Sequence, residues 1–424
     1  MLHSVRMLRA ALISLGLIST GVVVGEAQEA SPEAGPPEGC TVVAEGLINP
    51  RYVALGDDGT LYITEAGNGG DEDLTPPGEE ATPEDAPQLE ATPAEADAGG
   101  TPEGPQVGTR GDTGQITAVS PDGEQSVVAD GLPSYSEGVG PAGIVVGDGE
   151  LLVATGGSAV VTGIDPLENE NSILRIDIET GEVTQVAELG SYEVENNPDG
   201  DEVHPNLYGM DIGADGLLYV ADAGGNTVYS VDPATGEFDL VGVVPGPALP
   251  EAEEAAADAT PIADEELGGP PESVPTGLHV GEDGNVYVIT LGAFVPGAAE
   301  VLIVQADGTF VNAATGLSVG VGVALGPDGA LYASQLASFT SETEPPGPGN
   351  VVRIGEDGSI EPVVEGVPFP HGITFDEEGN LYVVANSTVF GPPPSEPNGE
   401  VWRCDGVASG EAASATVADH REAA

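Results

Sequence analysis

One short pattern occurs six times along the chain and constrains the fold more than any other feature. Each copy is a tight turn ending in Gly, followed by a short apolar strand. The copies read GDDGTLYITE (56–65), GDGELLVAT (147–155), GADGLLYVAD (213–222), GEDGNVYVIT (281–290), GPDGALYASQ (326–335) and DEEGNLYVVA (376–385). Without two acidic inserts, the spacing approaches the ~45–50 residues of a four-stranded propeller blade.

Further strands accompany each copy. An apolar-alternating strand precedes the turn, as in RYVALG (51–56) and TGLHVG (276–281). Two more strands joined by a Gly turn follow, as in ILRIDIETGEVTQVAEL (173–189). Alternation with period two and turns of the Asp-Gly or Thr-Gly type indicate antiparallel hairpins. The sequence therefore predicts an all-β, six-bladed β-propeller of four-stranded antiparallel blades.

The two ends of the repeat array complement each other. The last copy has a third strand, GEVWRC (399–404), and no fourth, whereas TVVAEGL (41–47) matches SVVADGL (126–132). We expect the N-terminal strand to complete the last blade, so that the propeller spans 39–405. The only two cysteines, Cys40 and Cys404, then fall near each other across this hairpin. A disulfide is expected in an oxidising compartment, and two unpaired thiols are the alternative.

The N-terminus has the features of a secretory signal. Arg6 and Arg9 precede an apolar run at 10–24, and small residues follow at 25–27. This arrangement predicts a signal peptide over 1–27, with an uncleaved single-span anchor as the alternative. A flexible linker is expected over 28–38 and a polar tail over 406–424. The cleaved protein is expected to be secreted or periplasmic and not embedded in a membrane.

The charge excludes several classes of partner. The chain has 72 Asp and Glu against 8 Lys and Arg, a net charge of −64. Binding to nucleic acid or to anionic lipid would need basic residues that are not present. Part of the acid lies in inserts at about 71–106 and 251–272, which we expect to be disordered. The excess fits either a saline medium or a sequence bias against Lys.

Four stretches resemble the secreted ScyD/ScyE family, which is similar to the NHL, gluconolactonase and strictosidine-synthase propellers. They are TVVAEGLINPRYVALGDDGTLYITEAGNGGD (41–71), GSYEVENNPDGDEVHPNLYGM (190–210), LYVADAGGNTVYSVD (218–232) and VPTGLHVGEDGNVYV (274–288). The segments NNPDG…NxYG and VADAGGN are the most specific. The resemblance implies a six-bladed fold and export, and it supplies no established activity. Relatives tend to carry Gly-Pro-His where this chain has Ala142, so no role for that His is carried over.

The long insertions predict where a ligand binds. They lie at 66–113, 156–171, 190–207, 245–275 and 386–398, after second strands or between blades. In a propeller these connections share one face, and loops on a rigid scaffold commonly carry binding residues. Two rings of aligned polar residues face this side. The expected ligand-binding residues are Arg51, Tyr208, Thr276 and His371 from the first strands, and Thr155, Thr290 and Gln335 from the second.

A metal site is a second hypothesis for the same face. Glu65, Asp222, Asn206 and Asn386 offer hard oxygen ligands for Ca²⁺ or another divalent cation. The similarity to gluconolactonase-like propellers implies such a site at the channel. His371 is the candidate general base. Under the alternative interpretation, these residues cap strand ends and bind loop backbone, and Arg51 pairs with Glu65.

Two functions therefore lead, and a third, a purely structural extracellular protein, also remains open. The first is an exported module that binds a small molecule or an extracellular protein partner through its loop-rich face. The alternative is a divalent-metal-dependent hydrolase or lactonase, and whether the protein is an enzyme at all is left undecided by the sequence.

Overall fold

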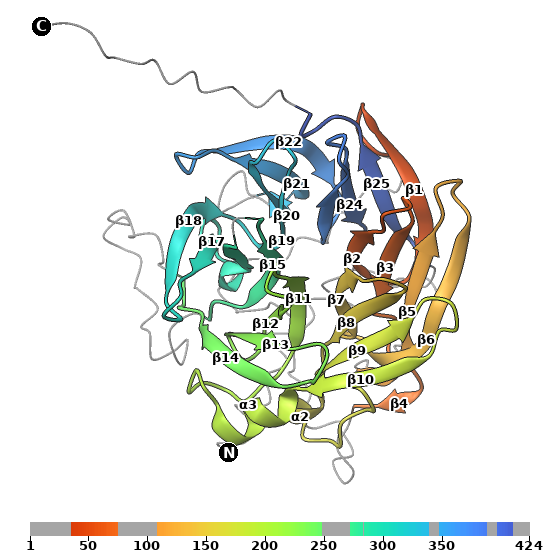
Figure 1. Cartoon of the computed structure of the whole chain (residues 1–424), viewed down its shortest axis with the longest axis vertical. Coiled ribbons are helices and arrows are strands. Elements are labelled where there is room, and N and C mark those ends of the chain that lie inside the picture. The colour runs from red at the N-terminus through yellow and green to blue at the C-terminus, as the bar shows by residue number, and fades with distance from the viewer. Residues whose placement is uncertain are drawn as a thin grey trace, which may run out of the picture.

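Six antiparallel sheets surround a central axis, as Figure 1 shows for the computed structural model. The residues that the structure describes are 35–74, 108–247, 272–282, 284–338, 347–387 and 397–409. The expectation of a six-bladed β-propeller is confirmed. The expected signal peptide, most of both acidic inserts and most of the C-terminal tail lie outside the described residues.

Each blade has four strands in antiparallel order. The first three blades contain β2 (Pro50–Leu55), β3 (Leu61–Glu65), β5 (Thr109–Val119) and β6 (Gln125–Tyr135); β7 (Pro141–Val146), β8 (Glu150–Thr155), β9 (Ser172–Asp177) and β10 (Val183–Glu188); and β11 (Leu207–Ile212), β12 (Leu218–Asp222), β13 (Thr227–Val231) and β14 (Phe238–Val243). A two-residue strand, β4 (Glu72–Asp73), also pairs with β5, so the first insert begins as part of blade 1.

The remaining blades follow the same plan. They contain β15 (Pro275–Val280), β16 (Val286–Thr290), β17 (Ala299–Val304) and β18 (Phe310–Leu317); β19 (Gly320–Leu325), β20 (Leu331–Ser338), β21 (Gly347–Ile354) and β22 (Ile360–Val367); and β23 (Ile373–Phe375), β24 (Leu381–Ala385), β25 (Gly399–Cys404) and β1 (Cys40–Leu47). In the described part of the chain, three short helices lie in the loops: α2 (Ala159–Thr162), α3 (Gly190–Asn196) and η1 (Gly292–Phe294).

The Gly of each repeated turn is needed for its backbone conformation. In the first copy Gly59 has φ of 84° and donates its N–H to Gly56 O at 2.9 Å. The Asp58 carboxylate accepts the N–H of Thr60 at 2.9 Å. An L-residue with a side chain is disfavoured at such a φ. Local hydrogen bonds and the Gly conformation therefore stabilise each repeated turn, which reverses the chain direction between two strands.

The innermost strands pack backbone to backbone around the axis. β2, β7, β11, β15, β19 and β23 each contact the next, and β23 contacts β2. Gly at the contact point permits the close approach. A Cβ on Gly322, for example, would lie 2.7 Å from His371 O.

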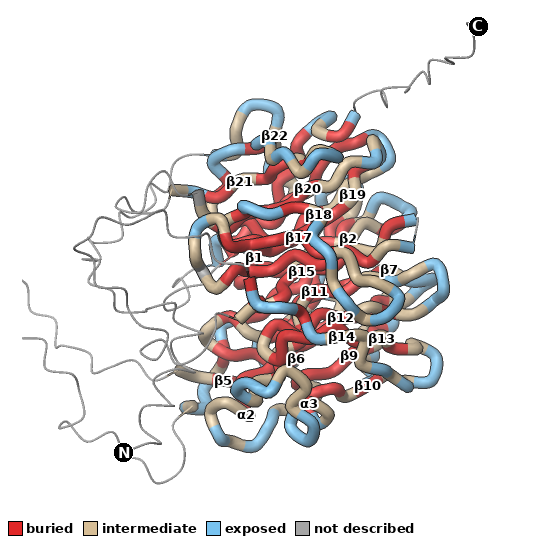
Figure 2. The backbone as a smooth tube through the Cα atoms, turned by 90° about the vertical axis from the view of Figure 1, so that its left-hand side faces the viewer, coloured by how far each residue is buried: buried red, intermediate tan, exposed pale blue. Residues whose placement is uncertain are grey.

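The hydrophobic core is divided among the blade interfaces. Buried side chains of one blade pack on those of the next, as Tyr332 of blade 5 does on Phe375 of blade 6. Figure 2 shows the buried strands inside and exposed turns at the edges.

The N-terminal strand closes the ring. β1 pairs antiparallel with β25, and Cys40 stands directly opposite Cys404. The two cysteines form a disulfide across 364 residues of sequence, which confirms the expected pairing. Among the described residues, the helices are all too short or too polar to cross a membrane.

Candidate functional site

Two side-chain links cross the propeller axis. The Tyr208 hydroxyl lies 2.6 Å from Nε2 of His371, and these residues come from blades 3 and 6, on opposite sides of the ring. The Tyr52 hydroxyl of blade 1 donates to Thr276 O of blade 4 at 2.5 Å. Tyr52 also makes edge contacts with both Tyr208 and His371. The axis is thus occupied by a hydrogen-bonded aromatic group, which we call the axial cluster (Tyr52, Tyr208, His371).

Tyr52 was not predicted as a site residue. The corresponding position in the other five blades is Gly: Gly143, Gly209, Gly277, Gly322 and Gly372. A single side chain in a ring of glycines has room to extend into the axis. The presence of Tyr52 where the other repeats have Gly was the feature of the sequence that could have identified it as a site residue.

Burial determines the charge state of the axial cluster. The pKa of His371 is lowered well below 6.5, mainly by burial and further by the Arg51 charge. Burial also raises the pKa of the Tyr208 hydroxyl. Both groups are therefore neutral near pH 7. The Nδ1 atom of His371 is buried without a hydrogen-bond partner among the described residues.

Arg51 lies beside this cluster without an acidic partner. Its side chain is 2% exposed and donates to Gly138 O and, at 2.8 Å, to Ser387 Oγ. The alternative that it pairs with Glu65 is wrong, because the Glu65 carboxylate accepts instead from Ile48 N, Gln115 and Thr117 at 2.5–2.8 Å.

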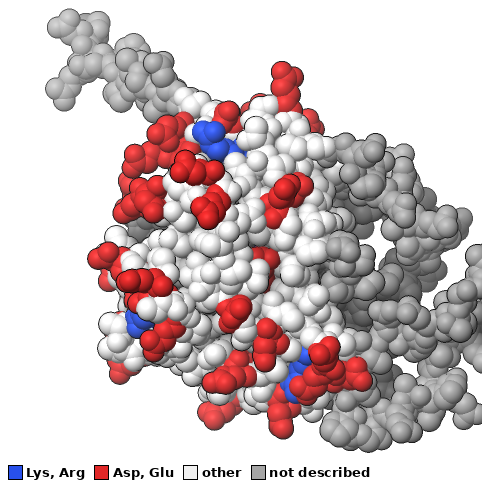
Figure 3. Space-filling view, turned by 90° about the vertical axis from the view of Figure 1, so that its right-hand side faces the viewer, with Lys and Arg blue, Asp and Glu red and all other residues white. Residues whose placement is uncertain are grey.

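The other arginines of the described chain all have carboxylate partners. The pairs are Arg110–Glu72, Arg175–Glu150, Arg353–Asp328 and Arg403–Asp405. Figure 3 shows one side of the molecule, where basic groups are few and lie against acidic ones. Arg51 is the exception among the arginines that the structure describes.

The polar residues at aligned positions near the ends of the second strands have a repeated structural role. Three of them accept the backbone N–H of a residue just before their own blade's first strand. The pairs are Glu65 with Ile48 at 2.6 Å, Asp222 with Asn206 at 2.7 Å, and Gln335 with Ser318 at 2.6 Å. Gln335 is also bonded to Asn350 through Nε2. Only Asp222 of these three keeps a buried, unpartnered side-chain oxygen, Oδ2, within the described residues.

The predicted threonines also hold backbone groups. Thr155 donates to Asn169 O at 2.5 Å. Thr276 donates to Gly320 O at 2.9 Å, and Thr290 accepts the N–H of Glu300 at 3.1 Å. These three hydroxyls anchor loops and neighbouring strands on the loop face.

The expected metal ligands do not share one set of contacts. Glu65 is saturated by donors from the β1–β2 loop and β5, whereas Asp222 and Asn206 bind each other in blade 3. Asn386 has a left-handed backbone, φ of 56°, and bonds Pro368 O through its N–H. Both oxygens of the Glu65 carboxylate already accept hydrogen bonds and neither is left for a cation, so Glu65 does not fit the expected site.

A second acidic group, Glu193 on α3, lies beside Asp222 and was missed by the sequence reasoning. Burial, with the charges of Asp222 and Asp199, raises the pKa of Glu193 to about 8. Burial likewise raises the pKa of Asp222 to about 6, against the effect of three backbone hydrogen bonds. Glu193 lies in a non-repeated insertion, where comparison between blades gives no information.

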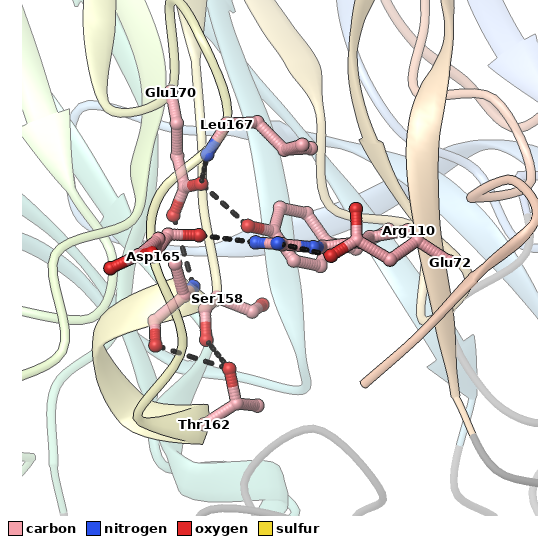
Figure 4. A network of polar contacts seen from close by, with 9 residues as sticks. Glu72, Arg110, Ser158, Thr162, Asp165, Leu167 and Glu170 are labelled. Carbon is pink, nitrogen blue, oxygen red and sulfur yellow. Dashed lines mark hydrogen bonds and ion pairs between the residues drawn. The ribbon is translucent and has the colours of Figure 1, made fainter. Parts of the chain in front are cut away.

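A separate polar network supports the loops of blades 1 and 2 (Figure 4). Glu170 accepts from the Tyr135 hydroxyl at 2.5 Å and from Leu167 N at 2.9 Å. Arg110 bonds Glu72 at 2.6 Å and also Asp165 O. The Glu170 carboxylate is therefore fully engaged and holds the loop that contains α2.

One match to a family model agrees with the fold. A model of the family described as "Beta-propeller repeat" matches residues 367–391. No curated protein matches the chain. Among solved structures, virginiamycin B lyase from Staphylococcus aureus is similar, at 15% identity over 81% of each chain, with a TM-score of 0.43.

Two further structures have comparable similarity. A gluconolactonase from Xanthomonas campestris has 11% identity over 86% of this chain and 88% of its own, with a TM-score of 0.47. A luciferin-regenerating enzyme has 11% identity over 88% of this chain and 96% of its own, with a TM-score of 0.48. At these identities and TM-scores the likeness carries no conclusion about this chain.

Proposed function

We propose that the protein is an exported β-propeller that binds a small organic anion on the loop face of its axis, beside the axial cluster. Export is supported by the signal-like segment 1–27 and is compatible with the Cys40–Cys404 disulfide. The resemblance to the ScyD/ScyE family points to the same compartment.

The observation that carries this proposal is the isolated charge of Arg51. A buried guanidinium without a countercharge is costly, and a carboxylate ligand would neutralise it. Its protein hydrogen bonds use three of its five N–H groups, so two have no partner among the described residues. These donors suit an anionic oxygen, and the nearby Tyr208 and His371 add polar contacts for orientation.

The metal-dependent hydrolase is the weaker alternative. In its favour, the neutral His371 has an unpartnered Nδ1, which accepts a proton in the tautomer whose Nε2 donates to the Tyr208 hydroxyl. Against it, both oxygens of Glu65 already accept hydrogen bonds. The free Oδ2 of Asp222 lies beside Glu193, which is not among the expected ligands. Binding is therefore the function that the geometry supports better.

The test compares two arginine variants in thermal unfolding with acetate, malonate, citrate and sulfate at constant ionic strength. Arg51→Gln removes the unpaired charge, and Arg403→Gln removes a half-buried one that is paired with Asp405. We expect at least one carboxylate to stabilise wild type and Arg403→Gln, and to leave Arg51→Gln unchanged. Equal stabilisation of all three proteins, or of none, would overturn the proposal.

A further inference from the structure

Five buried side-chain oxygens of α3, β12 and β13 have no hydrogen-bond partner among the described residues. They are Oε1 and Oε2 of Glu193, Oδ2 of Asp222, Oγ1 of Thr227 and the hydroxyl of Tyr229. All four side chains are 0% exposed. Unpartnered buried polar atoms are rare in proteins, and several in one place call for an explanation.

Strand geometry brings three of these groups together. Asp222 ends β12 and stands directly opposite Thr227, which begins β13. Tyr229 lies two residues further along β13 and so faces the same side of the sheet. Backbone N–H groups of Asn206, Gly224 and Gly225 hold Oδ1 of Asp222 at 2.7–3.2 Å. They fix the carboxylate and leave Oδ2 for the remaining neighbours.

Glu193 reaches the same point from α3. A Cβ on Gly225 would lie 3.0 Å from Oε2 of Glu193 and 3.1 Å from Oδ2 of Asp222. The two carboxylates therefore border one small volume. Burial raises the pKa of the Tyr229 hydroxyl, the charges of Asp222 and Glu193 raise it further, and the Thr227 hydroxyl lowers it.

The composition of this group selects its ligand. When ionised, the two carboxylates carry two negative charges. Asp199 adds a third charge nearby, and its carboxylate is already bonded to Asn226 at 2.9 Å. All five of these unpartnered atoms are hard oxygen ligands, which Ca²⁺ prefers. Two ionised carboxylates balance the charge of one divalent cation. The described residues contain no group of three or more His, Cys, Asp or Glu that could hold a metal, so neutral hydroxyls must complete this set.

We propose that Glu193, Asp222, Thr227 and Tyr229 form a binding site for one Ca²⁺ ion, away from the propeller axis. The site shares only Asp222 with the ligand set expected from the sequence. The ion would join α3, from the loop between blades 2 and 3, to β12 and β13. It would also stabilise the segment that contains NNPDG against the one that contains VADAGGN.

The first test measures thermal unfolding of the full chain in EDTA and in CaCl₂. High NaCl in both buffers screens non-specific binding to the acidic surface. Glu193→Gln removes a proposed ligand, and Glu195→Gln removes an exposed acid from the same helix as a matched control. We expect Ca²⁺ to raise Tm by several degrees in wild type and Glu195→Gln, and to have no effect in Glu193→Gln.

A second measurement does not depend on the carboxylate variant folding. Tb³⁺ replaces Ca²⁺ and emits when a neighbouring tyrosine is excited. Wild type should show saturable emission that Ca²⁺ displaces, and Tyr229→Phe should lose most of that emission. Tb³⁺ emission without saturation in wild type, or an equal Ca²⁺ effect on Tm in Glu193→Gln, would overturn the proposal.

Discussion

The hydroxyl of Tyr208 and Nε2 of His371 lie 2.6 Å apart and join blades 3 and 6 across the propeller axis. Opposite blades share no strand pairing, so this contact and that of Tyr52 with Thr276 connect parts of the ring that are otherwise held only through their neighbours. The axial cluster thus contributes to stability as well as to the proposed site.

The buried His371 predicts a pH dependence of stability. Its pKa in the folded protein lies well below the 6.5 of an exposed His, because of burial and the Arg51 charge. The unfolded chain therefore binds a proton first as the pH falls, and the stabilising contribution present above pH 6.5 is lost below it.

Comparison with His371→Gln isolates this effect. The free energy of unfolding of wild type relative to the variant should decrease between about pH 7.5 and pH 5, by at most about 1.4 kcal/mol per pH unit below the unfolded pKa. Denaturant titrations at several pH values measure it. A difference that stays constant, or that grows in acid, would show that His371 is not held neutral.

Tyr52→Phe should destabilise the protein by about 1 kcal/mol and at most about 3 kcal/mol. The variant keeps the aromatic side chain but removes the hydrogen bond to Thr276 O, which leaves a buried carbonyl with one partner fewer. Tyr219→Phe is the control, because its hydroxyl bonds the exposed Asp215. A loss no greater than that of Tyr219→Phe would contradict the role of Tyr52 in linking the blades.

Gly322→Ala should cost about 2 kcal/mol, because the new Cβ would lie 2.7 Å from His371 O and force two inner strands apart. Gly46→Ala serves as the reference. It meets no atom within 4 Å, and its φ of 72° alone predicts a cost of about 1 kcal/mol. Chemical denaturation gives both values. Equal losses would mean that the inner strands can separate without penalty.

Removal of the disulfide should cost about 4 kcal/mol, since the bond closes a loop of 364 residues in the unfolded chain. The double variant Cys40→Ser, Cys404→Ser is compared with wild type by urea unfolding, each with and without reductant. Reductant should lower the midpoint of wild type only. An unchanged midpoint would show that strand pairing alone secures the ring.

The fold could be predicted because its signals are local and repeated. Every blade has its own turn at a Gly, and alternation identifies each strand without knowledge of distant contacts. The disulfide followed from the same repetition, since the strand at 41–47 supplies what the last copy lacks.

The site was less accessible to this reasoning. Arg51 and Glu65 lie near each other in register, yet a carboxylate binds whichever donors the surrounding loops present, and those are not visible in a repeat. Glu193 lies in an insertion that has no counterpart in other blades. Its proximity to Asp222 depends on how α3 packs, which is a tertiary property.

Ring closure by β1 has a consequence for biogenesis. The first strand made cannot find its partner until residues 399–404 have been synthesised, so its edge stays open while almost all other blades form. Unpaired edges favour association between chains. A chain that stops before Cys404 would leave the edges of β1 and β24 exposed, so a closed ring forms only after translation has passed Cys404.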